Sequence, residues 1–366
     1  MTTSHKVFFS PSQSMYQLKD SSVDLVVTSP PYPMIEMWDG IMAAQNPKIQ
    51  EAFDNNQPQV AFELMHVELD AIWKECYRVI KDGGFLCINI GDATRTINGT
   101  FRLYNNHSRI VSKCLELGFD NLPNIIWRKQ TNAPNKFMGS GMMPCGAYVT
   151  LEHEYILVFR KGGKREYKKA DDKASRRQSS FFWEERNLWF SDMWDLKGVK
   201  QKIENATSRD RNASYPLEVP YRLINMYSQQ GDVVLDPFMG FGTTLQASML
   251  LGRHSIGYEI DGTLSKAINE MVTSLEPSDF NKLIIHRFDK HTQFVAERTK
   301  TNGALKHFNT KLNCEVMTGQ ETDIEFHFIT DVSSNLSSSA DMLEYEVFYE
   351  ESSDINCPPT SKGTLF

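Results

Sequence analysis

The sequence lacks several features that would assign it to whole classes of protein. Its six cysteines are dispersed without a Cys-x-x-Cys pair, so we expect reduced thiols rather than a disulfide framework or a zinc site. No apolar run reaches about 18 residues, which argues against a membrane-spanning helix. The opening residues Met1–Lys6 have no apolar core, so no export signal is expected. These absences predict a cytoplasmic protein.

Charge is distributed unevenly along the 366 residues. The whole chain carries a net charge of −7, but residues 311–366 hold eleven acidic residues against two basic ones. Between Arg160 and Arg177, nine basic residues stand against three acidic ones. The basic segment is therefore where we expect a polyanionic partner, unless it is an ordinary solvated surface.

Short apolar runs alternate with stretches of helical periodicity. This alternation predicts a parallel, doubly wound α/β sheet. The expected strands are 23–28, 85–91, 124–127, 154–159, 233–235, 255–259 and 283–286. The expected helices are 60–81, 109–117, 215–228 and one that begins near Thr243.

Three regions break this rhythm. Residues 33–60 are polar and contain Pro47 and Pro58, which predicts a long loop or lid. Residues 130–150 are rich in Gly, Met, Asn and Pro, and residues 160–212 combine the basic segment with a cluster of aromatic residues. The tail beyond residue 300 alternates weakly and becomes Ser-rich, so a small β appendage is expected there.

Two glycines stand at a predicted strand-to-helix turn in the segment 236–244 (DPFMGFGTT). Such a turn brings the backbone close to a ligand, with the N-terminus of the following helix behind it. Glu259 ends the next strand, as in nucleotide-binding folds where a carboxylate binds ribose hydroxyls. A purely structural tight turn is the alternative. No Gly-Lys-Ser/Thr follows, which excludes a phosphate-binding P-loop, and the departure from GxGxxG disfavours a nicotinamide cofactor.

A second motif, Ser29-Pro30-Pro31-Tyr32, ends the strand predicted at 23–28. Its two prolines fix the backbone and remove two N–H donors, leaving carbonyl acceptors beside a hydroxyl and an aromatic ring. This combination suits an exocyclic amine, which offers N–H groups and a π face. A Pro-Pro turn with a surface tyrosine is the alternative.

Together the two motifs resemble those of the DNA amino-methyltransferases, which methylate exocyclic nitrogens of cytosine or adenine with S-adenosylmethionine. The resemblance covers roughly residues 5–290 and includes the segments Lys74–Asp92, Leu151–Lys161 and Asn212–Ser228. The catalytic motif precedes the cofactor motif by about 205 residues, as in the permuted beta branch of the family. One departure is Asn212–Pro216, where family members often have His-Pro-Ala before the aromatic-Pro pair.

The resemblance implies a methyltransferase domain in residues 1–300, with a target recognition region at 160–211 and an acidic extension at 301–366. The catalytic residues that it implies are Ser29, Pro30, Pro31 and Tyr32. The cofactor-binding residues that it implies are Asp236, Pro237, Phe238, Gly240, Gly242, Thr243, Thr244 and Glu259. The expected DNA-binding residues are Lys161, Lys164, Arg165, Lys168, Lys169, Arg176 and Arg177. No metal is expected. The strands that end at Val27 and Leu235 should be neighbours, which would bring both motifs to one sheet edge.

Serine at the first motif position implies methylation of cytosine N4 in double-stranded DNA, because Asp or Asn is commoner in adenine-N6 enzymes of the family. The target base is expected to be flipped out of the duplex and stacked on Tyr32. The resemblance also implies a companion restriction endonuclease and a nucleoid-associated place in a bacterial cytoplasm. Alternatives are adenine-N6 or structured-RNA methylation and a non-catalytic DNA-binding protein. The target sequence and the choice between monomer and dimer stay open.

Four further residues suggest chemistry at first sight. Cys145 follows a proline, as the nucleophile of cytosine-C5 enzymes does, but amine methylation needs no thiolate, so we interpret it as structural or incidental. His153-Glu154 lacks the second histidine of HExxH, so no metal site is expected there. Asp92 follows the strand 85–91 and is a candidate for the cofactor cleft.

Overall fold

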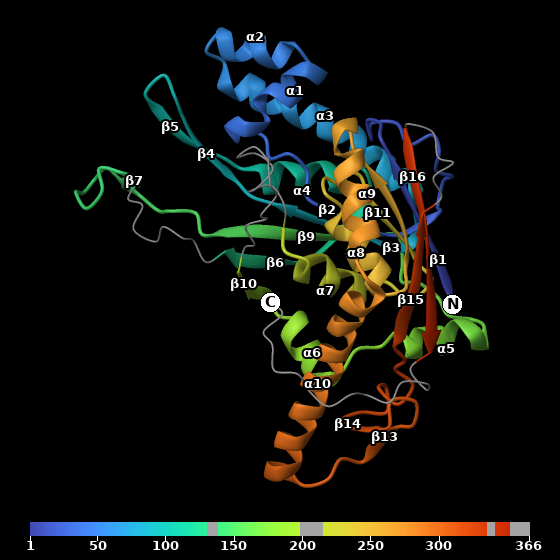
Figure 1. The fold of residues 1–366 in the computed structure, drawn as a ribbon. Coiled ribbons are helices and arrows are strands. Elements are labelled where there is room, and N and C mark those ends of the chain that lie inside the picture. The colour runs from blue at the N-terminus through green and yellow to red at the C-terminus, as the bar shows by residue number, and fades with distance from the viewer. Residues whose placement is uncertain (130–137, 198–214, 335–340, 352–366) are drawn as a thin grey trace.

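The protein is described here by a computed structural model that covers residues 1–129, 138–197, 215–334 and 341–351. Ten strands form one sheet in the order β10-β6-β9-β3-β2-β11-β12-β1-β16-β15 (Figure 1). Within those four ranges, no helix is long and apolar enough to cross a membrane.

The centre of the sheet is parallel and is buried on both faces. It consists of β3 (Ile80–Ile90), β2 (Val23–Thr28), β11 (Val233–Asp236), β12 (His254–Tyr258) and β1 (Thr2–Phe8), each parallel to its neighbour. All six residues of β2 are buried, as its mostly apolar, β-branched sequence predicts for a central strand. The first strand, β1, was not predicted from the sequence.

Antiparallel strands extend the sheet on both sides. On one side β9 (His153–Lys161) is antiparallel to both β3 and β6 (Phe119–Lys129), and β10 (Met193–Leu196) pairs with β6 in parallel. On the other side β16 (Met342–Glu351) is antiparallel to β1, and β15 (His327–Ser334) is antiparallel to β16. The predicted doubly wound sheet is confirmed at its centre, and the margins are mixed.

Helices cover both faces of the sheet. One face is covered by α3 (Pro58–Val79) and α4 (Asn106–Glu116), and the other by α7 (Glu218–Tyr227), α8 (Thr243–Leu250) and α10 (Pro277–Asn302). The two layers give two apolar cores that share the sheet between them. The predicted helices 60–81, 109–117 and 215–228 correspond to α3, α4 and α7, and the helix predicted from Thr243 is α8.

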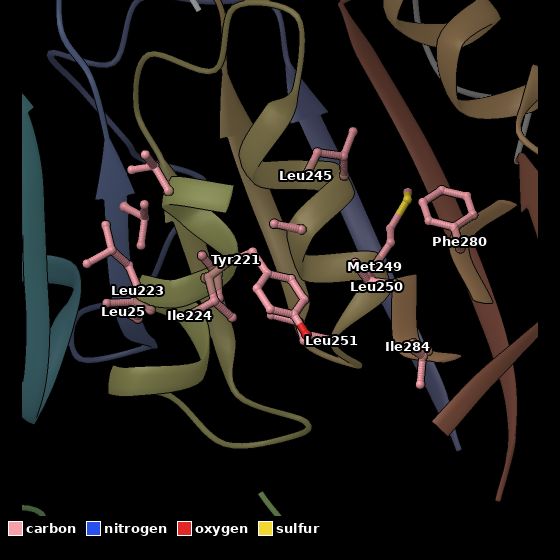
Figure 2. Close-up of a cluster of buried hydrophobic side chains, with 14 of the residues drawn as sticks. Leu25, Tyr221, Leu223, Ile224, Leu245, Met249, Leu250, Leu251, Phe280 and Ile284 are labelled. Atoms are coloured by element: carbon pink, nitrogen blue, oxygen red, sulfur yellow. The ribbon is translucent and has the colours of Figure 1, made fainter. Parts of the chain in front are cut away.

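Alternate residues of β2 point into different cores. Leu25 packs in the core that contains Leu223 and Ile224 of α7, and Figure 2 shows these side chains together. Val26, the next residue, packs in the opposite core with Met65 of α3. Because both faces of β2 are covered, the end of this strand is held rigidly, and so is the residue that follows it.

The prediction of a long loop at 33–60 is wrong, because this segment is largely helical. Pro47 immediately precedes one of its helices and Pro58 is the first residue of α3. Proline is tolerated in the first helical turn, where its missing N–H would have no intrahelical partner. The prolines therefore start helices here instead of breaking them. The helical elements before α3 are η1 (Glu36–Trp38), α1 (Asp39–Gln45) and α2 (Lys48–Asp54).

The strand predicted at 283–286 is also wrong, because these residues lie inside α10. Its short apolar run fits either type of element when it is taken alone. The longer pattern decides, since Phe280, Ile284 and His291 are all buried and are separated by four and seven residues. That spacing places them on one face of a helix.

The C-terminal part of the chain contributes to the main sheet. β16 pairs through its residues 342–348 with the whole of β1, and Tyr345 and Val347 are fully buried. The division at residue 300 into a catalytic domain and an extension stays a prediction, as does the recognition region at 160–211, of which 198–211 lie outside the described residues.

The remaining elements are β4 (Ala93–Ile97), β5 (Thr100–Tyr104), β7 (Met138–Gly139), β8 (Ala147–Tyr148), α5 (Ala170–Gln178), α6 (Trp183–Trp189), η2 (Gly262–Leu264), α9 (Ser265–Ser274), β13 (His307–Asn309) and β14 (Cys314–Val316).

If β16 is an integral strand of the sheet, Val347→Ala should lower the free energy of unfolding by about 1–3 kcal/mol, because it removes two buried methyl groups. Glu350→Ala, three residues further along the same strand, is the control, since Glu350 is exposed. Urea unfolding followed by circular dichroism measures both variants. An equal or larger loss for Glu350→Ala would contradict the integral role of β16.

Candidate active site

The two sequence motifs meet at the carboxyl edge of the sheet. β2 and β11 are neighbours, with Leu25 opposite Val234 and Val26 opposite Leu235, which confirms the predicted adjacency of the two strands. The Thr28 hydroxyl at the end of β2 donates to Oδ1 of Asp236 at 2.6 Å. A hydrogen bond between residues 208 positions apart thus connects the Ser-Pro-Pro-Tyr motif to the glycine turn.

Asp236 organises the glycine turn from its first residue. The side chain is buried, and its Oδ1 also accepts a hydrogen bond from the Phe238 N–H at 3.1 Å. Its Oδ2 accepts from Thr244 at 2.6 Å and from the Tyr215 hydroxyl at 3.4 Å. Burial raises the pKa of Asp236, while these donors oppose that rise. Both oxygens therefore have partners within the chain, and a direct contact with cofactor stays a prediction.

The turn itself depends on its two glycines. Gly240 and Gly242 have φ values of +53° and +84°, in the left-handed region that side chains disfavour, and Gly242 directly precedes α8. Glu259, at the end of β12, accepts from the Gly240 N–H at 2.8 Å through Oε2 and from the Asp261 N–H at 2.9 Å through Oε1. Burial raises the pKa of the Glu259 carboxyl. Glu259 thus fixes the turn as well as facing the adjoining cavity.

A cavity of about 470 Å³ opens between the motifs. Ser29 and Pro31 line it from the first motif, and the turn residues from Asp236 to Gly240 line it from the second. Glu259 lies on the same wall. The volume lies within the range of roughly 300–1,000 Å³ that is common for small-molecule sites. An apolar pocket with a few converging carboxylates suits a ligand that has an aromatic base, a ribose and a positive charge.

Sequence reasoning missed part of the cavity wall. The loop Ser10–Gln13 after β1 contributes to it, as do Trp38 and Ile41 from the helical segment predicted as a loop. The first was missed because β1 itself was not predicted. The second lies in a short polar segment without clear periodicity, in which a single tryptophan gives no signal of ligand contact.

Behind the first motif, three polar side chains lie within hydrogen-bond distance of the Tyr32 hydroxyl. This hydroxyl donates to Oε2 of Glu154 at 2.8 Å, and Nδ2 of Asn89 donates to the Tyr32 oxygen at 2.8 Å and to Glu154 at 2.7 Å. The Ser29 hydroxyl lies 3.2 Å from the Tyr32 oxygen, and Lys129 pairs with the other Glu154 oxygen. Burial, reinforced by the negative charge of Glu154, raises the pKa of Tyr32 well above its usual range. Tyr32 is therefore a neutral phenol with a fixed hydroxyl.

The Tyr32 ring is also limited by the backbone beside it. A Cβ atom added to Gly91 would lie 3.0 Å from Cε2 of Tyr32, so the absence of a side chain there makes room for the ring. Asn89 and Glu154 are almost fully buried, and neither was predicted as a site residue. Asn89 had a signal in the sequence, because it is the one polar residue in the apolar run Ile88-Asn89-Ile90. Glu154 was considered only as part of a metal motif.

Other candidates lie outside the cavity. The Asp92 carboxylate accepts from the His107 N–H at 3.0 Å and pairs with its imidazole Nδ1 at 2.7 Å, and Asp92 does not line the pocket between the motifs. Cys145 is exposed. Residues 212–214 lie outside the described part of the chain. Among the residues that are described, no group of three or more His, Cys, Asp or Glu side chains is placed to hold a metal ion.

The predicted DNA-binding residues lie at the opposite, amino edge of the sheet. Lys161 donates to the carbonyls of Tyr77 and Ile80 at 2.8 Å, and Arg165 forms an ion pair with Asp232 at 2.7 Å. In Figure 1, the helix α5 lies near the N-terminus, far from α1 and α2. The other members of this group, whose DNA contacts stay predictions as well, are Lys164 and Lys168 in the loop before α5, Lys169 at its start and Arg176 and Arg177 within it.

An α/β sheet with a Ser-Pro-Pro-Tyr motif beside a glycine turn at its carboxyl edge defines the class of S-adenosylmethionine-dependent amino-methyltransferases. Comparison with known proteins agrees with this conclusion. The profile of the N6/N4 methyltransferase family, described as DNA methylase, matches residues 23–270, so the chain belongs to this family of DNA methyltransferases.

Two relatives align with this chain over nearly their whole length. Type II methyltransferase M.MthZI of Methanothermobacter thermautotrophicus is 47% identical over 96% of both chains. M.MjaI of Methanocaldococcus jannaschii is 47% identical over 78% of this chain and 98% of its own. Among solved structures, a Thermus thermophilus protein assigned as a DNA modification methylase and complexed with S-adenosyl-L-methionine is 31% identical, with a TM-score of 0.56 over 73% of this chain and 92% of that one.

Gly240→Val should weaken S-adenosylmethionine binding by at least roughly tenfold, or about 1.4 kcal/mol. A Cβ atom at Gly240 would meet no protein atom within 4 Å, so the new side chain would project into the cavity while it strains the turn. Gly231→Val is the matched control, because Gly231 also has a positive φ, +78°, and open space, but lies before β11 at the other edge. Isothermal titration calorimetry measures both affinities. Equal losses would show that strain alone is responsible and that the cavity is not the cofactor site.

Proposed function

We propose that this protein transfers the methyl group of S-adenosylmethionine to the exocyclic N4 of cytosine in double-stranded DNA. The observation that carries the choice of base is Ser29, which occupies the first position of the motif and lies on the cavity wall within 3.2 Å of the Tyr32 hydroxyl. A hydroxyl at this point accepts a hydrogen bond without adding a negative charge. Methylation of adenine N6 is the main alternative, because the family includes both activities.

The chain's own residues fit the cofactor. Phe238 and Trp38 offer apolar faces for an adenine ring, and Glu259 offers a carboxylate for ribose hydroxyls. The carboxylates around the cavity also favour a positively charged sulfonium. When bound, S-adenosylmethionine supplies an electrophilic methyl group. Direct contacts of Pro237, Thr243 and Thr244 with the cofactor belong to the same proposal.

The target cytosine would be bound at Tyr32 after it is flipped out of the duplex, since its amine is otherwise paired. The ring of Tyr32, held by Glu154 and Asn89, provides the stacking surface. The Ser29 hydroxyl and the Pro30 carbonyl would accept hydrogen bonds from the amine N–H groups. These bonds turn the nitrogen lone pair away from conjugation with the base and toward the methyl group. Positioning and electrostatics then provide the acceleration, without a covalent enzyme intermediate.

The names of the two methanogen relatives support a role as a type II modification enzyme. Such an enzyme protects the sites that a companion endonuclease would cut, so we extend the proposal to a restriction-modification pair. The companion is functional and need not bind this chain. A cytoplasmic location beside the nucleoid follows from the substrate and belongs to the same proposal.

The product identifies the function directly. We expect the purified protein, incubated with S-adenosylmethionine and mixed-sequence duplex DNA, to yield N4-methylcytosine when the DNA is digested to nucleosides and weighed by mass spectrometry. Tyr32→Ala should abolish this product while cofactor binding persists, because the stacking ring and its hydroxyl are lost and Tyr32 does not line the cavity between the motifs. N6-methyladenine would overturn the base assignment and keep the enzyme class. If RNA alone were methylated, the assignment of the substrate to DNA would fail.

Glu154→Gln should lower kcat by roughly ten- to a hundredfold with little change in cofactor affinity, because a hydrogen bond to a charged group contributes about 1.5–3 kcal/mol. The reason is positional: Glu154 fixes the Tyr32 hydroxyl. In a Tyr32→Phe background the same change should cost much less, since that hydroxyl is already absent. Single-turnover methylation assays on the four proteins of this double-mutant cycle measure the coupling. Additive effects would mean that Glu154 acts on the site in some other way.

A further inference from the structure

A second, larger hollow lies at the amino edge of the sheet. Its volume is about 1070 Å³, and its wall includes Asp24 at the start of β2, Gly84 and Phe85 near the start of β3 and Arg160 near the end of β9. Ser29 follows the other end of β2. At about 3.3 Å per residue, the six residues of β2 separate this hollow from the catalytic motif by roughly 20 Å.

Positive charge is concentrated around this hollow. Seven of its lining residues are basic and two are acidic, although the whole chain has a net charge of −7. The basic residues are Lys81, Arg160, Lys164, Arg165, Lys173, Arg176 and Arg177, and the acidic ones are Asp24 and Asp82. A concentration of one sign in a concave surface attracts counter-charged ligands more strongly than the same charges on a convex one.

Some of these cations hold the walls together. Arg165 pairs with Asp232 through two hydrogen bonds of 2.7 and 3.0 Å and lies 3.6 Å from Asp24. Lys81 pairs with Asp24 at 2.7 Å. Arg177 pairs with Asp323, which connects α5 to the segment before β15. The walls of the hollow are therefore connected by ion pairs and form a defined part of the fold.

Three other cations are left available. Lys164, Lys173 and Arg176 have no carboxylate within 4 Å among the residues that the structure describes. Arg176 lies over the ring of Tyr167, 4.5 Å from its centroid, which orients the guanidinium without neutralising it. Lys173 and Arg176 are one turn apart on α5, so they share a face of that helix.

We propose that this hollow is a sequence-independent site for the phosphate backbone of a second DNA segment, separate from the duplex that supplies the target base. Lys and Arg side chains of this kind bind phosphates without reading bases. The hollow is open and exceeds the usual volume of a small-molecule pocket, which favours an extended polyanion over a free metabolite. Because it faces away from the catalytic motif, it can hold one stretch of DNA while the carboxyl edge samples another. The proposal rests on DNA as substrate and not on which base is methylated.

The test removes only the three available cations. The variant carries Lys164→Gln, Lys173→Gln and Arg176→Gln. A matched control with the same change in net charge carries substitutions at exposed lysines outside the hollow, Lys266→Gln, Lys300→Gln and Lys306→Gln. Binding to a long fluorescent non-target duplex is titrated at several salt concentrations. Methylation is measured on a short duplex with one target and on a long duplex with several, using the target sequence mapped from methylated DNA.

We expect the hollow variant, and not the control, to lose about 2 to 3 from the slope of log affinity against log salt, since each phosphate contact contributes about 0.9. It should also methylate fewer sites per encounter on the long duplex, with a smaller loss of kcat/KM on the short duplex. An unchanged slope would overturn the proposal. So would an equal loss on the short duplex, which would place the hollow in the target interface. Absence of methylation by the unaltered protein would overturn the proposed function alone, because the binding titration would still test the hollow.

Discussion

The hydrogen bond from Thr28 to the buried carboxylate of Asp236 joins two parts of the chain that are remote in sequence and adjacent in the sheet. Through its other contacts, Asp236 also holds the first turn of α8 and the Phe238 backbone. A buried carboxylate that lost these donors would keep a large desolvation cost, so the contacts are mutually dependent. The Ser-Pro-Pro-Tyr motif, the glycine turn and the cavity between them therefore form as one unit or not at all.

This dependence explains which features could be predicted from the sequence. β2 and β11 are short, mostly apolar runs, each followed by Pro or Gly residues that end the strand, so their positions and the edge at which they meet follow from local chemistry. The segment 283–286 could not be assigned in that way, because its apolar run is too short to show its period without Phe280 and His291. β1 gave no signal either, since its partly polar pattern becomes a strand only through its partners β12 and β16.

The residues of the site divide in the same way, into those that a local sequence motif reveals and those that only strand pairing brings into place. Ser29, Tyr32 and the glycine turn are recognisable because their chemistry is contained in contiguous motifs. Asn89 and Glu154 reach Tyr32 from β3 and β9, and the pairing of these strands decides which of their residues face it. No local sequence pattern shows which residues of these two strands lie opposite each other. The basic segment shows the converse case: its composition was plain, but the antiparallel direction of β9 carries it to the edge away from the catalytic motif.

The charges and hydrogen bonds around Tyr32 compensate one another. A carboxylate as buried as Glu154 is costly unless it is paired, and Lys129 with Asn89 supplies the charge and the hydrogen bond that it needs. With those demands met, Glu154 can accept the hydrogen bond from the Tyr32 hydroxyl and keep the phenol neutral, so that no negative charge develops at the proposed base-stacking surface. The hydroxyl of Ser29 is then a neutral acceptor at the cavity wall. An exocyclic amine, which has N–H groups to donate and must stay uncharged until it is methylated, is the substrate that such a wall suits.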